Sequence, residues 1–251
     1  MNPQNRAALD RAERAGYLPG LRRIANQACV PFWWHSGGIS NDYRILNNGT
    51  LCLVDTGRRK IGVTADHVYS EYLCNKQLIP EVVCQIGGTT FTPEERLIDR
   101  SATLDLASFE LTDVVVAASG GYFHAPPTWP TSVVHEGDAI LLGGYPGRLR
   151  DKGEATAEMP FQWFVGAAAS VSPFNVSLNL DLNNMHQPLR PRAQLNSDLG
   201  GMSGGPVFRF VPTPIERLEL VGFIYEYQES YELILARPAV CVQDIGMLAP
   251  N

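Results

Sequence analysis

Residues 200–208 place one serine, Ser203, among four glycines and directly before an apolar run with the composition of a β-strand. Glycines permit positive φ angles and close approach of another chain, so the amides of Gly201 and Ser203 can both point toward the Ser203 hydroxyl. Two such amides would form an oxyanion hole beside a nucleophilic serine. The alternative is a glycine-rich turn that enters a strand, so partners elsewhere in the chain must decide.

Two earlier segments carry the partners that a reactive serine needs. His67 ends the β-rich run 61–67, and Asp105 starts the alternating segment 105–111. A serine hydroxyl needs a base that works near pH 7, and the base needs an anion that fixes its tautomer and stabilises its charge. The sequence therefore predicts a catalytic triad of His67, Asp105 and Ser203.

Two other aspartates compete for the role of the acid. Asp66 adjoins His67 and would tend to point away from its ring, whereas Asp99 lacks the small, apolar strand pattern that follows Asp105. Each member of the triad also has a structural alternative. His67 could cap a turn, Asp105 could simply begin a strand, and Ser203 could fill a glycine turn.

The order of the three residues separates classes of serine hydrolase. An α/β-hydrolase has its acid and then its histidine after the serine, but the last histidine here is His186, before Ser203. A subtilisin-type order requires an acid before the histidine. Asp42, Asp55 and Asp66 satisfy that order, but the surroundings of Ser203 do not resemble that family.

Three segments together resemble the signatures of the chymotrypsin/trypsin-like serine proteases, especially their bacterial, disulfide-poor members: residues 64–68, 105–111 and 201–207. Residues 49–55 resemble the strand before the family's histidine, and residues 141–147 resemble the turn that opens its second barrel. The resemblance spans residues 30 to 246. It implies an all-β fold of two antiparallel six-stranded Greek-key β-barrels. It also implies a serine endopeptidase that forms an acyl-enzyme and uses no metal or cofactor.

Short strands separated by turns support barrel or sandwich packing, with turns expected at residues 47–50 and 56–58. The expected organisation is a helical N-terminal extension (1–28), a first β-barrel with His67 and Asp105 (29–118), a linker rich in proline and glycine (119–132), and a second β-barrel with Ser203 (133–251). The extension could be a docking site for a regulatory partner or could pack on the body of the protein.

Composition limits the partners and the compartment. The net charge of −6 and the lack of a basic block argue against nucleic acid, so the expected partner is a protein or peptide substrate. Neither a signal-peptide pattern nor a membrane-spanning stretch is evident, which favours a cytoplasmic protein. The five cysteines contain no Cys-x-x-Cys pair, and buried free thiols in a reducing compartment are expected.

The resemblance also suggests how substrate would bind. Ser197 falls at the base of the primary specificity pocket, with Asp198 one position away, and residues Tyr225, Glu226 and Tyr227 fall on the strand that pairs with substrate. Because side chains alternate along a strand, Tyr225 and Tyr227 should share one face and Glu226 the other. A tyrosine on the wall of the pocket would fill volume that a large side chain needs, and Ser197 supplies no carboxylate for lysine or arginine. A small or medium uncharged residue is therefore expected before the cut bond, and Glu226 would favour basic residues further along the substrate.

The residue before the serine bears on activation. In trypsin-like zymogens an aspartate at this position pairs with a newly cut N-terminus, but here the position is Met202. The resemblance therefore implies activity without proteolytic maturation. Two other functions stay open: a catalytically impaired binding module, because Tyr225–Tyr227 departs from the usual small residues, and an esterase on the same fold.

Overall fold

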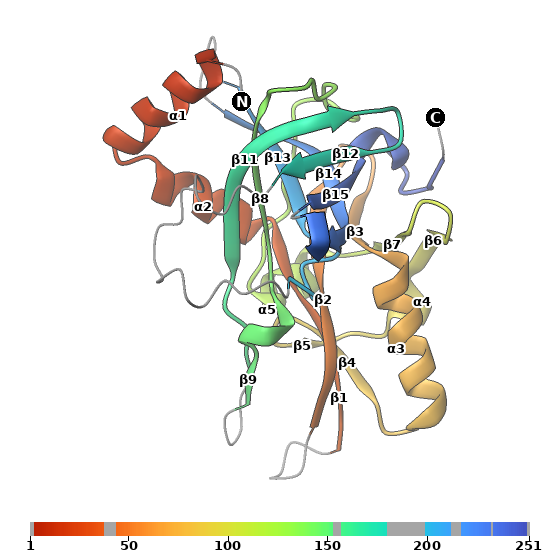
Figure 1. Ribbon diagram of the computed structural model, residues 1–251. Helices are drawn as coiled ribbons and strands as arrows, with labels where there is room; N and C mark the ends of the chain where they lie inside the picture. Colours follow the sequence, from red (N-terminus) through yellow and green to blue (C-terminus); the bar gives the residue numbers. More distant parts are fainter. Residues whose placement is uncertain are drawn as a thin grey trace.

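The computed structural model describes residues 3–37, 44–152, 157–179, 199–211, 217–231 and 233–249. It is mostly β, with one antiparallel sheet and one closed barrel stacked along the long axis of the molecule (Figure 1). Two pairs of helices flank them, α1 with α2 on one side and α3 with α4 on the opposite side (Figure 1).

The first half of the chain forms a seven-stranded sheet in the order β5-β4-β1-β2-β3-β7-β6. Its strands are β1 (Cys29–Ser36), β2 (Arg44–Asp55), β3 (Lys60–Thr64), β4 (Val83–Ile86), β5 (Thr89–Thr90), β6 (Leu97–Ser101) and β7 (Leu106–Glu110). The expectation of a six-stranded first barrel is therefore wrong for the described residues, which form a seven-stranded antiparallel sheet whose edge strands β5 and β6 do not pair to close it.

The second half forms a closed six-stranded barrel in the order β11-β12-β15-β14-β13-β8. These strands are β8 (Ala139–Gly144), β11 (Gln162–Val171), β12 (Val176–Asn179), β13 (Pro206–Val211), β14 (Arg217–Gln228) and β15 (Leu233–Pro238). A separate two-stranded hairpin joins β9 (Asp151–Lys152) to β10 (Ala157–Glu158). The expectation of a six-stranded antiparallel barrel therefore holds for this half.

Helices account for the elements that strand periodicity did not predict. The chain contains α1 (Pro3–Arg14), α2 (Leu18–Gln27), α3 (Asp66–Leu78), α4 (Pro93–Arg96) and α5 (Asp113–Ser119), with 3-10 turns η1 (Gly147–Leu149), η3 (Glu229–Tyr231) and η4 (Ala239–Cys241). The extension is helical as expected, and α2 packs on the body through Leu18, Leu21 and the buried Ala25. No described helix is both long and apolar enough to cross a membrane.

Helix α3 is the most consequential of the unexpected elements because His67 is its second residue. Its buried apolar side chains are Val68, Tyr69 and Tyr72, a spacing that puts all three on one helical face. That face packs against Phe109 of β7, with Tyr69 at 5.2 Å between ring centroids. This spacing is typical of a helix. The segment also contains valine and tyrosine, which are common in strands, and the helix was therefore not predicted.

The expected turn at residues 47–50 is wrong. Asn47 and Asn48 lie inside β2, where they pair with Trp34 and Trp33 of β1. Asparagine and glycine favour turns locally, but pairing with a strand that is buried on both faces outweighs that preference. The placement of residues 47–50 in β2 matters for the site, because Thr50 of β2 donates a hydrogen bond to Ser203 O.

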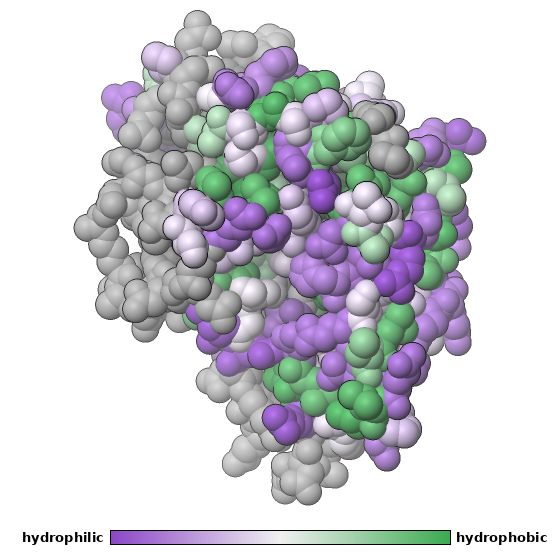
Figure 2. Space-filling model, turned by 45° about the vertical axis from the view of Figure 1, so that its right-hand side comes forward, coloured by the Kyte–Doolittle hydropathy of each residue, from purple (hydrophilic) through white to green (hydrophobic). Residues whose placement is uncertain are grey.

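Three clusters of buried side chains stabilise the structure. One lies between the first sheet and α3, a second fills the barrel, and a third joins the two halves. The third cluster contains Cys52 and Ile61 from the sheet together with Phe208 and Leu220 from the barrel. On the face to which α3 and α4 contribute, small apolar areas are separated by hydrophilic ones (Figure 2).

Candidate active site

His67, on α3, and Asp105, in the turn before β7, form a two-point contact. Asp105 Oδ2 lies 2.8 Å from His67 Nδ1, and Asp105 Oδ1 accepts a hydrogen bond from the His67 backbone amide, also at 2.8 Å. A carboxylate at Nδ1 favours the tautomer with its proton on that nitrogen and leaves Nε2 as the base. The two bonds fix both the position and the orientation of the imidazole.

The Asp105 contact also changes the acidity of the imidazole. The hydrogen bond to Asp105 raises the pKa of His67 above its ordinary value, partial burial opposes this, and the negative charges of Asp105, Glu71 and Asp66 add to the increase. The His67 side chain is still 49% exposed, so a substrate can reach it. A histidine of this kind can take up a proton and hold it while a bond is broken.

The rival acids are engaged elsewhere. Asp66 is buried and receives two hydrogen bonds from Arg100, at 2.8 and 3.0 Å. Asp99 accepts hydrogen bonds from the amides of Arg100 and Leu248. Of the three candidates, the structure places only Asp105 against the imidazole of His67.

Asp105 has φ +50°, the left-handed region that a residue with a side chain adopts at a cost. Arg237 of β15 holds the preceding segment from the barrel side, since its Nε donates to Leu104 O at 2.6 Å and its Nη2 to Thr103 O at 3.4 Å. Its guanidinium also lies 4.0 Å from the ring centroid of Tyr225. The second half of the chain thus helps to position the acid of the first half.

Residues 199–205, the Ser203 loop, are fixed through their carbonyl oxygens. Four successive carbonyls accept hydrogen bonds: Gly200 O from Gly147 N (2.6 Å), Gly201 O from Thr50 Oγ1 (2.8 Å), Met202 O from Gly205 N (2.8 Å) and Ser203 O from Thr50 N (2.9 Å). Because a trans peptide is planar with its C=O and N–H opposed, fixing the carbonyls of residues 200 and 202 also orients the amides of Gly201 and Ser203. Neither amide donates to another group within the described ranges.

The close packing of this loop requires glycine at position 201. Gly201 has φ +94°, and a Cβ there would lie 2.6 Å from Tyr145 O and 2.7 Å from both Asn48 Nδ2 and Gly147 N. Such contacts are shorter than any side chain tolerates, so the loop cannot keep this conformation with another residue. The glycines that suggested a reactive serine therefore have a physical role in shaping the loop.

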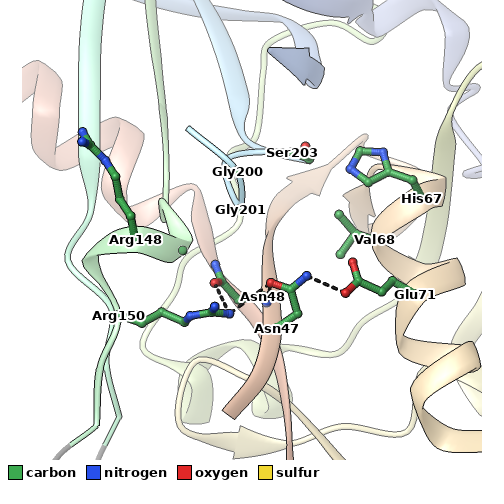
Figure 3. A pocket seen from close by; sticks show the side chains of 11 residues that line it. Asn47, Asn48, His67, Val68, Glu71, Arg148, Arg150, Gly200, Gly201 and Ser203 are labelled. Atoms are coloured by element: carbon green, nitrogen blue, oxygen red, sulfur yellow. Dashed lines mark hydrogen bonds between the residues drawn. The ribbon is translucent and has the colours of Figure 1, made fainter. Parts of the chain in front are cut away.

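Ser203 and His67 line one cavity of about 410 Å³. Figure 3 shows Ser203 and His67 at one end of it and a polar network at the other. In that network Asn47 Nδ2 donates to Glu71 Oε1 at 2.6 Å, and Arg150 Nη1 donates to Asn47 Oδ1 at 3.0 Å and to Asn48 Oδ1 at 3.2 Å (Figure 3). No hydrogen bond to Ser203 Oγ occurs among the described residues.

Sequence reasoning missed most of the residues that surround the triad. Asn47, Glu71, Arg150 and Arg237 carry no motif, and Thr50 was only part of the strand-like segment 49–55, so their roles depend on contacts across the fold. The Asn47-Asn48 pair offered the one local signal, which was interpreted as a turn.

The predicted substrate-binding residues are only partly within the described structure. Ser197 and Asp198 lie outside the described residues. On β14, Glu226 is exposed, whereas Tyr225 is buried and its hydroxyl donates to Asn175 Oδ1 at 3.1 Å. Tyr227 packs against the barrel cluster.

The expectation that Tyr225 and Tyr227 share one face is wrong. The register of β14 against β15 shifts between Ile224 and Glu226, so a bulge at Tyr225 interrupts the alternation of side chains. Tyr225 consequently packs with the cluster of the first sheet, and Tyr227 packs with the cluster inside the barrel.

All five cysteines are free; Cys29, Cys52, Cys84 and Cys241 are buried, while Cys74, on α3, is exposed. Burial raises the pKa of the buried thiols, which makes them poor nucleophiles. Across the described ranges, no group of three or more His, Cys, Asp or Glu side chains is arranged to hold a metal ion.

The site combines a histidine held by a carboxylate with a serine beside two amides that donate to no group in the part of the chain that the structure describes. Nucleophilic acyl transfer uses a base, a nucleophile and oxyanion donors of these kinds. No protein-family model matches this chain, and no curated protein matches it. Similarity to known proteins therefore assigns no family to the chain.

Proposed function

We propose that the protein is a serine endopeptidase that hydrolyses peptide bonds through His67, Asp105 and Ser203. The observation that carries this proposal is the anchoring of the Ser203 loop, in which the amides of Gly201 and Ser203 donate to no other group among the described residues. Two oriented amide donors beside a serine can bind a developing oxyanion without reorganising. A structural glycine turn would not require them.

The proposed fold is a variant of the two-barrel chymotrypsin-like architecture. The first half of the chain supplies His67 and Asp105, the loop before β13 of the barrel supplies Ser203, and His67 and Ser203 line one cavity. This division of the triad between two β-rich halves is what the resemblance of residues 64–68, 105–111 and 201–207 implies.

In the proposed reaction Ser203 Oγ attacks the carbonyl carbon of the substrate while His67 Nε2 takes the hydroxyl proton. The carbonyl oxygen becomes an oxyanion, which accepts hydrogen bonds from the amides of Gly201 and Ser203. As the carbon–nitrogen bond breaks, His67 donates its proton to the leaving amine and an acyl-enzyme forms on Ser203. A water molecule then attacks the ester, with His67 again acting as base, and releases the acid.

Asp105 contributes by stabilising the imidazolium that forms in each step, consistent with the raised pKa of His67. The missing contact between Ser203 Oγ and His67 Nε2 is compatible with this mechanism, because such hydrogen bonds often tighten only when substrate is bound.

A fluorophosphonate probe tests the proposal directly. Purified protein should be labelled on Ser203, as located by peptide mapping, and Ser203→Ala should abolish the label. Asp105→Asn tests the acid of the triad, because it replaces one carboxylate oxygen with an amide group of the same size. It should slow labelling by about 10⁴, the loss in kcat that this change causes in a Ser-His-Asp triad. Mass spectrometry of a diverse peptide mixture then identifies the cleaved bonds.

The outcomes separate the alternatives. A folded wild-type protein that takes no label on Ser203 would support a binding module and refute the proposal. Turnover of small activated esters without cleavage of any peptide would support an esterase. Labelling on Ser203 together with cleavage of peptides supports the endopeptidase.

A further inference from the structure

We propose that Thr50, on β2 of the first sheet, is a positioning residue that holds the Ser203 loop in its active conformation. This inference rests on the proposed function of the same site. Thr50 contacts no substrate in the proposed mechanism, and its role is to hold the two peptide groups that follow Gly201 and Ser203. It is fully buried, so water cannot replace its hydrogen bonds.

Every polar atom of Thr50 is used, and three of its four hydrogen bonds reach the second half of the chain. Its amide donates to Ser203 O at 2.9 Å, and its hydroxyl donates to Gly201 O at 2.8 Å and accepts from Tyr145 N at 3.0 Å. Its carbonyl accepts from Thr64 Oγ1 at 2.7 Å within the first sheet.

The topology explains why Thr50 is available for this role. The ladder between β2 and β3 starts at Cys52 opposite Val63, so Thr50 lies beyond its end. On the other side, Thr50 is opposite Pro31 of β1 in a pair whose main-chain groups point away from each other, since Pro31 O accepts from Gly87 N. The main chain of Thr50 is therefore free to bind the Ser203 loop.

The hydroxyl of Thr50 fixes Gly201, a loop residue whose lack of a side chain would otherwise let its backbone rotate. Gly147 N fixes the peptide before Gly201, and Thr50 Oγ1 fixes the peptide after it. With both planes held, the φ and ψ angles of Gly201 cannot change, and its amide keeps one orientation. Without the hydroxyl, Gly201 O loses its donor and this glycine can rotate.

In trypsin-like proteases, an ion pair between the aspartate before the serine and the newly cut N-terminus orders the oxyanion hole. In this chain the hydroxyl and amide of Thr50 perform that ordering. Met202 replaces the aspartate of that pair, and its side chain is buried in the barrel cluster. The Ser203 loop is ordered by hydrogen bonds to its carbonyl oxygens. Thr50 of the first sheet supplies two of them, to Gly201 O and Ser203 O. The two halves of the chain must therefore be docked for the site to be complete.

The experiment compares fluorophosphonate labelling of wild type, Thr50→Val, Thr50→Ala and Thr50→Ser. Both the maximal labelling rate and the probe concentration for half-maximal rate are measured. Loss of one whole oxyanion donor costs about 10²–10³ in rate, so partial misorientation in Thr50→Val should cost about tenfold to a hundredfold in maximal rate, with little change in the half-maximal concentration. Thr50→Ser retains the hydroxyl and should keep a rate within about threefold of wild type.

Ser108→Ala is the matched control. Ser108 is fully buried, and its hydroxyl donates to Gly246 O at 2.6 Å across the fold without touching the Ser203 loop. It should lower the melting temperature as the Thr50 variants do, but it should leave the labelling rate unchanged.

Each outcome decides between the two proposals. If wild type is labelled and folded Thr50→Val or Thr50→Ala is labelled equally fast, the role of Thr50 is refuted and the endopeptidase stands. If neither hydroxyl-free variant folds while Ser108→Ala does, Thr50 serves the fold alone and the positioning role is refuted. If wild type is not labelled, the proposed function fails first and takes this inference with it.

Discussion

Arg237 provides a test of how the two halves cooperate at the acid. Its Nε and Nη2 hold the carbonyls of Leu104 and Thr103, directly before Asp105. Arg237→Met removes these charged hydrogen bonds but keeps most of the side chain's bulk. Each such bond contributes about 1.5–3 kcal/mol, so a lower free energy of unfolding is expected.

The catalytic effect follows from the strained backbone of Asp105. A residue held at φ +50° stores on the order of 1–3 kcal/mol, and without Arg237 the segment can release that strain by moving. A free-energy change of about 1.4 kcal/mol corresponds to a factor of ten, so the population with Asp105 paired to His67 should fall about tenfold to a hundredfold. The maximal labelling rate, measured at the pH where it no longer rises, should fall by the same factor.

The pH profile supplies a readout that loss of stability alone would not change. His67 must be neutral to act as a base, so the labelling rate of wild type should rise with pH through a pKa above the ordinary value of 6.5, because Asp105 raises it. If Arg237→Met lets Asp105 withdraw, this midpoint should move to lower pH. Simple removal of a positive charge near the site would move it to higher pH.

Arg209→Met is the control, because Arg209 is a partly buried barrel arginine that pairs with Glu219 at 2.7 Å, away from the site. It should destabilise the protein and leave the midpoint in place. An unchanged midpoint in folded Arg237→Met, or a shift to higher pH, would refute the positioning of Asp105 by Arg237.

Three further predictions concern the same site. The chain that begins at Met1 should label without trimming, because Val30 is buried within β1 and a cut there would break the strand; an uncut protein that is inert until trimmed near residue 30 would contradict this. Gly201→Ala should reduce labelling by at least the ~10² of a lost oxyanion donor, because its Cβ would lie 2.6 Å from Tyr145 O; normal labelling kinetics would contradict it. Peptide profiling should show small or medium uncharged residues before the cut bond, whereas dominant lysine or arginine would point to Asp198 at the base of the pocket.

Local patterns in the sequence were sufficient for the strands of the barrel and for the order of the candidate residues. Short apolar runs bounded by turn residues are typical of buried strands, which is why short antiparallel strands were expected in the half of the chain that forms the barrel. The glycines around Ser203 were also informative, because the need for glycine at a crowded position of positive φ is a property of the residue itself.

Competing local preferences explain the errors. Residues 47–50 have turn chemistry but are held in β2 by pairing with β1, and α3 contains residues that suit strands but packs on Phe109. The bulge at Tyr225 depends on how β14 meets β15, which alternation within β14 cannot reveal. In each case an interaction with a distant element outweighed the preference of the segment.

The sequence alone determined which residue types were present for acyl transfer and in what order, since these are properties of the chain. Only the tertiary structure decided that Asp105 rather than Asp66 or Asp99 meets His67, and which residues orient the site. Thr50 and Gly201 are 151 positions apart, and Arg237 and Leu104 are 133 apart. Contacts over such separations form only when the sheet and the barrel dock through their shared apolar cluster, so no local pattern could encode them.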